Sequence, residues 1–206
     1  MRKLGMIGGM GWASTQSYYA IINREVQRRS GPMCSAPLLI ESLNFCDIAR
    51  ITTPEGWAFA ATRLIEAAKT CESGGAGALI ICANSMHKVY DQVAESIDIP
   101  VLHIADCVGE KMKADGIGRA ALIGTRNVMT ESFYRQKLVG HGIKLLPPDM
   151  ARVEEIDRII YEELMLGKVV RQSERTMKTF LTDIAKEDVD AVVLGCTELE
   201  MIVDTK

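Results

Sequence analysis

Two cysteines occupy matched positions in the sequence and together could do acid–base chemistry. In the stretch ALIICANSMHKV, residues 78–89, an apolar run ends at Cys82 and small polar residues follow. The stretch AVVLGCTELEMI, residues 191–202, places Cys196 in the same way. The unperturbed pKa of a thiol is about 8.5, which a protein environment can tune toward neutrality. The two stretches therefore predict a site where thiols exchange protons with a substrate or attack it.

Each cysteine is predicted to lie between a strand and a helix. In a parallel α/β sheet, ligands bind beyond the carboxyl ends of the strands. Backbone N–H groups at the start of the next helix would hold a substrate carboxylate and lower the pKa of the thiol. The alternative is that both are ordinary buried cysteines. That ordinary interpretation applies to the other four cysteines, the first two expected in loops and the last two on helices: Cys34, Cys46, Cys71 and Cys107.

Two further polar side chains are candidates. His87 follows Cys82 by five residues and could serve as the base for a nucleophilic thiol, or could pack on its own helix. Lys168 follows a predicted helix stop at Gly167 and could pair with an acidic group, or could be an exposed residue at a helix end.

The glycine-rich start, GMIGGMGW, excludes two nucleotide-binding motifs. A G-x-G-x-x-G motif would need a glycine where Ser14 stands, and no Gly-Lys-Ser/Thr follows for a P-loop. The N–H groups of residues 9–11 could instead approach a small ligand. A tight strand–helix turn is the alternative.

The apolar runs that precede these residues predict an α/β fold. They are nearly continuous rather than alternating, which indicates parallel strands covered on both faces. The predicted strands are Lys3–Ile7, Pro37–Glu41, Ala78–Ile81, Arg119–Ile123, Ile143–Leu146 and Ala191–Leu194.

Helical patterns lie between the strands. Ser14–Arg29 carries an apolar stripe of Tyr18, Ile22 and Val26. Thr53 and Pro54 make a cap and first residue for a helix that runs to about Glu72. Two further helices are predicted from the spacing of Val153, Ile156, Ile160 and Leu164, and over Ser173–Ala185.

An internal repeat predicts two similar lobes. KLGMIGG and RAALIGT each end a strand in glycine, at Gly8 and Gly124, and a strand ending in cysteine follows each. The separations nearly match, 82 − 8 = 74 and 196 − 124 = 72. We therefore expect two lobes, 1–100 with Cys82 and 101–206 with Cys196, each a mainly parallel sheet flanked by helices. A pseudo-twofold would relate them.

The overall composition and charge argue against nucleic acid, membrane and metal ions as binding partners. The 206 residues are 48% hydrophobic with a net charge of −3, and no basic stripe indicates nucleic-acid binding. The start of the chain has neither a signal peptide nor a membrane span, which predicts a cytoplasmic protein. The cysteines form no C-x-x-C pair and the histidines no metal-binding spacing, so reduced thiols and no metal site are expected.

Together these motifs resemble the aspartate/glutamate racemase family over the whole chain. The resemblance is carried by IGGMGW with Ser14 and Thr15, CANSMHKV, HIAD, LIGT, EEL with the later GK, and GCTEL. It implies a cofactor-independent enzyme of two similar α/β lobes that acts on a small amino acid as a homodimer. Relatives continue past GCTEL with a segment that returns to the first lobe, whereas the sequence here stops at Lys206; the resemblance leaves open whether the chain is truncated or has a further tail.

The resemblance also assigns residues. Cys82 and Cys196 match the catalytic cysteines of the family. The substrate-binding positions match Met10, Asn84, Ser85, Lys168, Thr197 and Glu198. There are two departures: Ala13 stands where many relatives have Glu, and Ser85 stands where Thr is usual but keeps the hydroxyl.

The implied reaction is racemisation of aspartate or glutamate. One thiolate would remove the Cα proton while a thiol on the opposite face returns one. Donors near Asn84, Ser85 and Thr197 would stabilise the enediolate at the α-carboxylate. Two alternatives stay open. One is a related single-thiol enzyme, of the maleate isomerase or decarboxylase kind. The other is a two-lobed amino-acid-binding protein without turnover.

Overall fold

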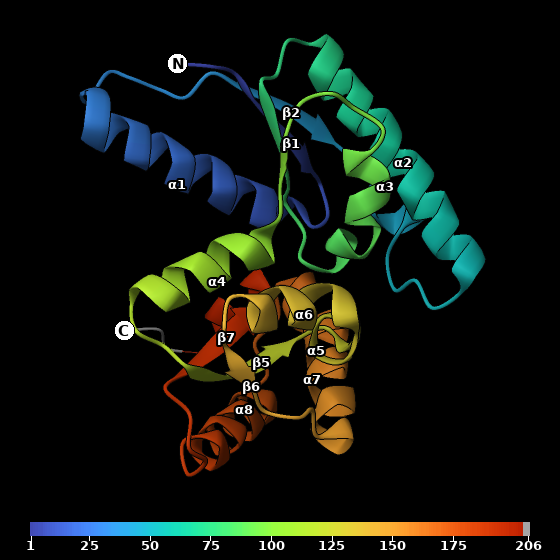
Figure 1. Cartoon of the computed structure of the whole chain (residues 1–206). Helices are drawn as coiled ribbons and strands as arrows, with labels where there is room; N and C mark the ends of the chain where they lie inside the picture. The colour runs from blue at the N-terminus through green and yellow to red at the C-terminus, as the bar shows by residue number, and fades with distance from the viewer. Residues whose placement is uncertain (204–206) are drawn as a thin grey trace. The chain divides into compact units, whose positions relative to one another are not determined.

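The computed structural model describes residues 1–203 and divides the chain into two compact units, Met1–Ile104 and Ala105–Lys206. Each unit holds one parallel sheet with helices against it (Figure 1). The predicted α/β class is thereby confirmed.

The sheet of unit 1 has the order β2-β1-β3-β4, with every pair parallel. Its strands are β1 (Leu4–Gly8), β2 (Leu38–Ser42), β3 (Ala78–Ile81) and β4 (Val101–Leu102). Three of them agree with the predicted runs to within one residue. The fourth was missed because two residues are too few to show a pattern.

The helices of unit 1 are α1 (Trp12–Ser30), α2 (Pro54–Ser73) and α3 (Tyr90–Ala94), with the short 3₁₀ helices η1 (Phe45–Asp47) and η2 (Ser85–Val89). The predicted cap is confirmed, since the Thr53 side chain accepts a hydrogen bond from the Gly56 N–H at 3.1 Å. Cys71 lies on a helix as predicted. Cys46 lies in η1 rather than in a loop.

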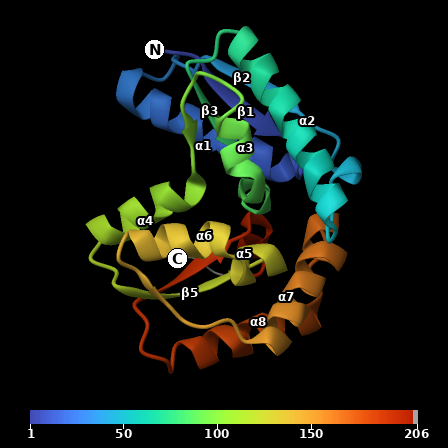
Figure 2. The same cartoon turned by 45° about the vertical axis from the view of Figure 1, so that its right-hand side comes forward.

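The core of unit 1 forms where α2 packs against the sheet (Figure 2). Leu64 and Cys71 of α2 are fully buried there, with Leu79 of β3. Helix α1, of nearly the same length, buries only Ser14 and Thr15, and its predicted apolar stripe is half-buried. The start of α1 is therefore its best-anchored part.

Unit 2 has the sheet order β6-β5-β7, again all parallel. Its strands are β5 (Arg119–Gly124), β6 (Lys144–Leu145) and β7 (Ala191–Gly195). The helices are α4 (Ile104–Ala114), which begins at the boundary, α5 (Arg126–Thr130), α6 (Ser132–Gly140), α7 (Met150–Glu162) and α8 (Arg171–Ile184). The 3₁₀ helices are η3 (Leu164–Leu166) and η4 (Thr197–Met201).

The helical spacing predicted for unit 2 is confirmed by burial. Val153, Ile156 and Ile160 of α7 are buried against the sheet, and Leu164 joins them from η3. Gly167, predicted as the stop of this helix, adopts φ +70° and ends η3 instead. Since α7 ends at Glu162, the α-helix stops before the predicted position, and η3 fills the interval up to Gly167.

The two sheets share one topology, as the internal repeat predicts. In both, the first strand lies between the second and the third, and the third ends at the cysteine. β5 and β7 approach closely where Gly124 faces Gly195. A Cβ added to Gly124 would lie only 3.0 Å from the Gly195 carbonyl oxygen. Small residues are therefore required at that edge of unit 2.

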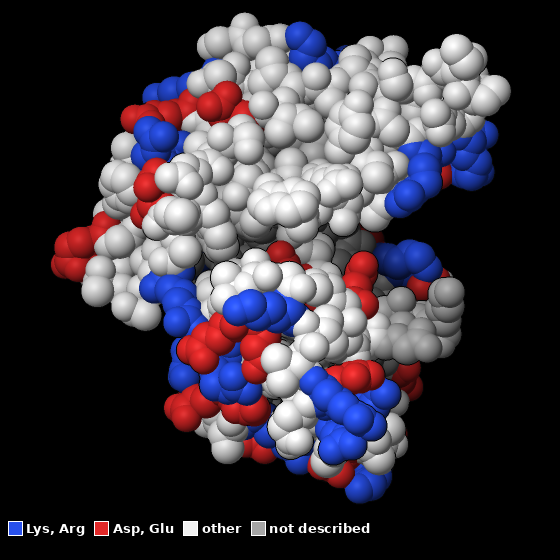
Figure 3. Space-filling view, turned by 180° about the vertical axis from the view of Figure 1, so that it is seen from behind, with Lys and Arg blue, Asp and Glu red and all other residues white. Residues whose placement is uncertain are grey.

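Charge is distributed without a basic stripe on the face seen in Figure 3. Lys and Arg stand beside Asp and Glu over the helices of unit 2, and much of the visible face of unit 1 is uncharged. Several charged side chains of unit 2 are paired within one helix, as Arg158 is with Glu155. Among the described residues, no helix is long and apolar enough to cross a bilayer.

Candidate active site

Cys82 stands directly after β3, at the carboxyl edge of the unit 1 sheet. Its N–H donates to the carbonyl of Ile7 at 2.9 Å, which continues the β1–β3 ladder by one residue. The residue is 1% exposed. Cys82 is thus held in register with the end of β1, where the glycine loop begins.

The environment of Cys82 overturns the predicted lowering of its pKa. Burial raises the pKa of the Cys82 thiol to about 12, and the nearby Cys71 raises it further. The following helix, η2, is a 3₁₀ helix of five residues rather than an α-helix. A helix this short has little macrodipole to set against desolvation.

His87 is not a base for Cys82. Its Nδ1 lies 3.0 Å from the carbonyl oxygen of Ala83, and its Nε2 accepts from the Ile104 N–H at 3.3 Å. Both ring nitrogens are therefore occupied, with the hydrogen on Nδ1. Burial lowers the pKa of His87 to about 3, so the ring is neutral. The packing alternative from the sequence is the correct one.

Asn84 and Ser85 follow Cys82 at the turn into η2. The Oδ1 atom of Asn84 is buried and has no hydrogen-bond partner within the described chain. An unpaired buried acceptor is costly, so a ligand donor at this atom would be favourable. Ser85 is the first residue of η2 and is half-buried.

The glycine loop is a tight strand–helix turn. The Gly9 N–H donates to the Thr15 hydroxyl at 2.8 Å, so it does not point at a ligand. Gly9 has φ +85°, and a Cβ there would collide with the carbonyl oxygen of Leu43. Met10 is 3% exposed and packs in the core of unit 1, so its side chain belongs to the hydrophobic cluster there.

Cys196 occupies the equivalent position in unit 2, directly after β7. It is 6% exposed and packs in the hydrophobic core of unit 2. Its thiol donates to Glu198 Oε2 at 3.0 Å, and the Thr197 hydroxyl donates to the same oxygen at 3.0 Å. Glu198, assigned to substrate binding by resemblance, is therefore also a direct partner of the thiol.

The pKa of the Cys196 thiol is raised well above its ordinary value, again opposite to the sequence prediction. Burial is the largest cause, and the negative charge and hydrogen bond of Glu198 add to it. The following η4 is another five-residue 3₁₀ helix. Burial and the Glu198 carboxylate thus both favour the protonated form of Cys196. No carboxylate contributes in this way to the raised pKa of Cys82.

Two polar residues at the edges of unit 2 were missed as site candidates. Thr125 directly follows β5, and its buried hydroxyl has no partner among the described residues. Glu163 is 8% exposed, and its Oε1 accepts from Arg158 at 2.8 Å while its Oε2 is buried without a partner. The sequence signal for Thr125 was its place directly after a strand-ending glycine.

Lys168 lies just past η3, which packs against η4 in unit 2. Its N–H donates to the Glu163 carbonyl at 3.0 Å, and its side chain is exposed. The turn therefore holds the Lys168 backbone firmly and leaves the ammonium group reachable from solvent. Among residues 1–203, no cluster of His, Cys, Asp and Glu is arranged to hold a metal ion.

Comparison with known proteins gives consistent matches. The family model described as Asp/Glu/hydantoin racemase matches residues 7–205. The chain is 30% identical over 149 residues to glutamate racemase of Persephonella marina, a match that covers 68% of this chain and 53% of that protein. The chain thus spans about half the length of the curated relatives it matches.

Two solved structures align with this chain over its whole length. A Yersinia pestis protein solved as a candidate Asp/Glu racemase has a TM-score of 0.91 at 37% identity, covering 100% of this chain and 90% of that one. An aspartate racemase homologue from Pyrococcus horikoshii has a TM-score of 0.76 at 33% identity, covering 100% of this chain and 89% of that one. With two parallel sheets of one topology, each ending a strand in cysteine, and a family match over residues 7–205, the chain belongs to the Asp/Glu/hydantoin racemase family.

Proposed function

We propose that the protein racemises an acidic amino acid, aspartate or glutamate, without a cofactor, through Cys82 and Cys196. The observation that carries this proposal is the repeated placement of the two thiols. Each follows the third strand of the same topology and is followed by a five-residue 3₁₀ helix. Family membership supports racemase chemistry, and the repeat supports two equivalent proton-transfer groups.

The thiols differ in their readiness to ionise, which assigns their resting roles. Both pKa values are raised by burial, but only Cys196 also donates to a carboxylate. Glu198 therefore favours Cys196 as the thiol in the resting protein, and Cys82 is the group that releases its proton to solvent when substrate binds. A bound ammonium group near Cys82 would favour that ionisation, since an opposite charge lowers a thiol pKa.

The reaction then proceeds by proton exchange alone. The Cys82 thiolate takes the hydrogen from Cα, so that the C–H bond breaks, an S–H bond forms, and the electron pair moves into the enediolate. Cys196 delivers its proton to the opposite face of Cα and becomes the thiolate. The opposite enantiomer reverses these roles.

Neighbouring groups would bind and stabilise the substrate. The unpartnered Oδ1 of Asn84 suits an N–H of the substrate's ammonium group. The hydroxyls of Ser85 and Thr125 and backbone N–H groups in these turns would hold the α-carboxylate, where a well-placed donor contributes about 3 kcal/mol to the enediolate. Lys168, with its exposed ammonium, is the proposed partner of the distal carboxylate.

The test is hydrogen exchange at Cα in deuterated buffer, with Cys82→Ser, Cys196→Ser and the control Cys107→Ser, a change at an exposed cysteine on α4. We expect each active-site variant to lose racemisation by about 10²–10⁴-fold. Each should keep deuterium exchange with one enantiomer only, and the two variants should keep opposite ones. The control should behave as the unmodified protein.

Two outcomes would count against the scheme. Normal racemisation by both single variants would exclude the two-thiol mechanism. Calorimetric binding of aspartate or glutamate, with no exchange of either enantiomer, would favour the amino-acid-binding alternative.

A further inference from the structure

Unit 2 contains a cavity of about 290 Å³ that none of the candidate catalytic residues lines. It lies between β5, the segment after β6, and the helices α7 and α8. Its walls are apolar over most of their area. The apolar lining includes Leu122, Ile123, Leu146, Ile156, Phe180 and Ile184.

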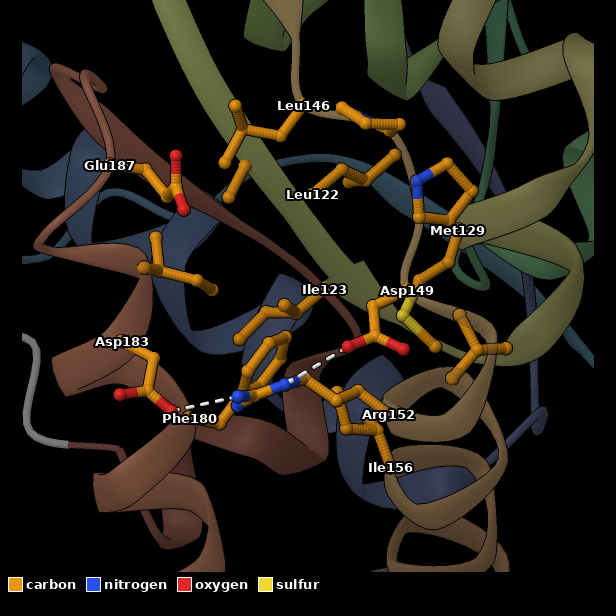
Figure 4. A pocket seen from close by; sticks show the side chains of 15 residues that line it. Leu122, Ile123, Met129, Leu146, Asp149, Arg152, Ile156, Phe180, Asp183 and Glu187 are labelled. Atoms are coloured by element: carbon orange, nitrogen blue, oxygen red, sulfur yellow. Dashed lines mark hydrogen bonds and ion pairs between the residues drawn. The ribbon is translucent and has the colours of Figure 1, made fainter.

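The polar part of the lining is acidic. It consists of three carboxylates, Asp149, Asp183 and Glu187, and one guanidinium, Arg152. Arg152 donates to Asp149 at 3.2 Å and to Asp183 at 2.7 Å, and lies 4.7 Å from the ring centre of Phe180 (Figure 4). Arg152 is therefore already committed to two carboxylates and a ring, and is not available to an anionic ligand.

Glu187 is the one carboxylate of the cavity lining that Arg152 does not contact. Figure 4 shows it across the cavity from Leu122. Within residues 1–203, its side chain makes no hydrogen bond or ion pair. It also stands just beyond the end of α8, near the negative end of the helix dipole, and the neighbouring Lys186 is already paired with Asp183 at 2.8 Å. Both features favour a positive charge at this end of the cavity.

The volume of the cavity indicates the size of the apolar part of a ligand that it could hold. A cavity of about 150 Å³ lined by apolar side chains binds benzene. This one has nearly twice that volume, which matches an aromatic ring with a short amine-bearing chain. Pockets that are mostly apolar with a few convergent polar groups are typical small-molecule sites.

We propose that this cavity is a second ligand site, which binds a small arylalkyl or branched alkyl amine with its ammonium group on Glu187. The apolar portion contacts β5, α7 and α8, and the Arg152 bridge between Asp149 and Asp183 forms one wall. The site does not depend on the proposed racemase activity, because it uses residues of unit 2 other than Cys196, Thr197 and Glu198.

The test uses three matched probes: 2-phenylethylamine, the neutral 2-phenylethanol and the anionic 3-phenylpropanoate. Each is titrated into the full chain while amide and methyl shifts are followed by NMR. We expect saturable shifts at Ile156 and Ile184 with the amine, with a Kd on the order of 1 mM for a ligand of this size. The alcohol should bind about tenfold more weakly, and the anion weaker still.

A pair of variants separates the charge from the cavity. Glu187→Gln should weaken amine binding by about tenfold and leave alcohol binding unchanged, as the loss of one charge-assisted hydrogen bond predicts. Glu174→Gln, at an acid of α8 that pairs with Lys178, is the control and should change neither. Equal binding of the three probes, an unchanged amine affinity in Glu187→Gln, or shifts outside the cavity would overturn the proposal.

Discussion

The contact between Cys196 and Glu198 is the most informative single interaction at the residue scale. A carboxylate that accepts from a buried thiol stabilises the protonated sulfur, because a thiolate in the same place would face a like charge. The same oxygen also holds the Thr197 hydroxyl. Glu198 thus positions both side chains, and its removal should change the acidity of Cys196 without any substrate present.

The first prediction concerns this acidity. Glu198→Gln removes the negative charge, so the pKa of the Cys196 thiol should fall. The rate of Cys196 alkylation by iodoacetamide, followed by mass spectrometry, should reach its midpoint about one pH unit lower than in the unmodified protein. Glu200→Gln, at an exposed acid two residues later, should leave the profile unchanged. An unchanged or upward-shifted midpoint in Glu198→Gln would show that the carboxylate does not hold the thiol.

At the scale of elements, His87 links the turn after Cys82 to the start of α4. Its ring accepts from the Ile104 N–H, one of the N-terminal donors that a helix cannot satisfy internally. It lies 4.6 Å from the ring of His103, centre to centre, and its neutral form is required by the Ile104 contact, because a protonated Nε2 could not accept. The conformation of η2 therefore depends on a histidine that resists protonation.

This gives a pH dependence with a definite sign. The pKa of His87 is about 3 in the folded chain against 6.5 for the free side chain, so the unfolded state binds the extra proton. The stabilisation is complete above about pH 6.5 and is lost as the pH falls toward 3. At pH 4.5 the free energy of unfolding should be lower by about 2–3 kcal/mol than at pH 7 from this group.

Urea unfolding at the two pH values measures this loss, with fluorescence as the probe, since both tryptophans, Trp12 and Trp57, lie in unit 1. His87→Gln should be less stable at pH 7 but should show a correspondingly smaller difference between pH 7 and 4.5. The same difference in both proteins would mean that other groups carry the acid sensitivity.

At the scale of the whole molecule, two units with separate cores each carry half of the proposed chemistry. Unit 1 has its own hydrophobic cluster around α2, and unit 2 has another around α7 and α8. The proposed reaction uses one thiol from each unit on one substrate. The homodimer predicted from the family resemblance stays a prediction.

A substrate that engages both thiols should protect both units. Hydrogen exchange followed by mass spectrometry should slow at η2 and at η4 when aspartate or glutamate is added. At a ligand concentration near 100 Kd, openings that release the ligand become about 100-fold rarer. Sodium chloride at equal ionic strength is the control. Protection confined to one unit would contradict a shared substrate.

Much of the fold followed from local sequence patterns. Apolar runs of four to six residues mark buried parallel strands, and Thr53 with Pro54 marks a helix start, because these signals depend on the periodicity and capping of a single segment. Strand β4 was not predicted, because a strand of two residues is too short to show a hydrophobic pattern. The matched positions of Cys82 and Cys196 were also readable, since a strand that ends in cysteine is a local feature.

The sequence alone therefore determined the α/β class, the internal repeat and the two strand-end cysteines, all of which depend on neighbours in the chain. The acidity of the thiols, the engagement of both nitrogens of His87 and the use of the Gly9 N–H by Thr15 were decided by tertiary structure. The physical reason is that desolvation and hydrogen-bond partners come from segments far along the chain. Local sequence predicted thiols with lowered pKa values, and packing raised them instead.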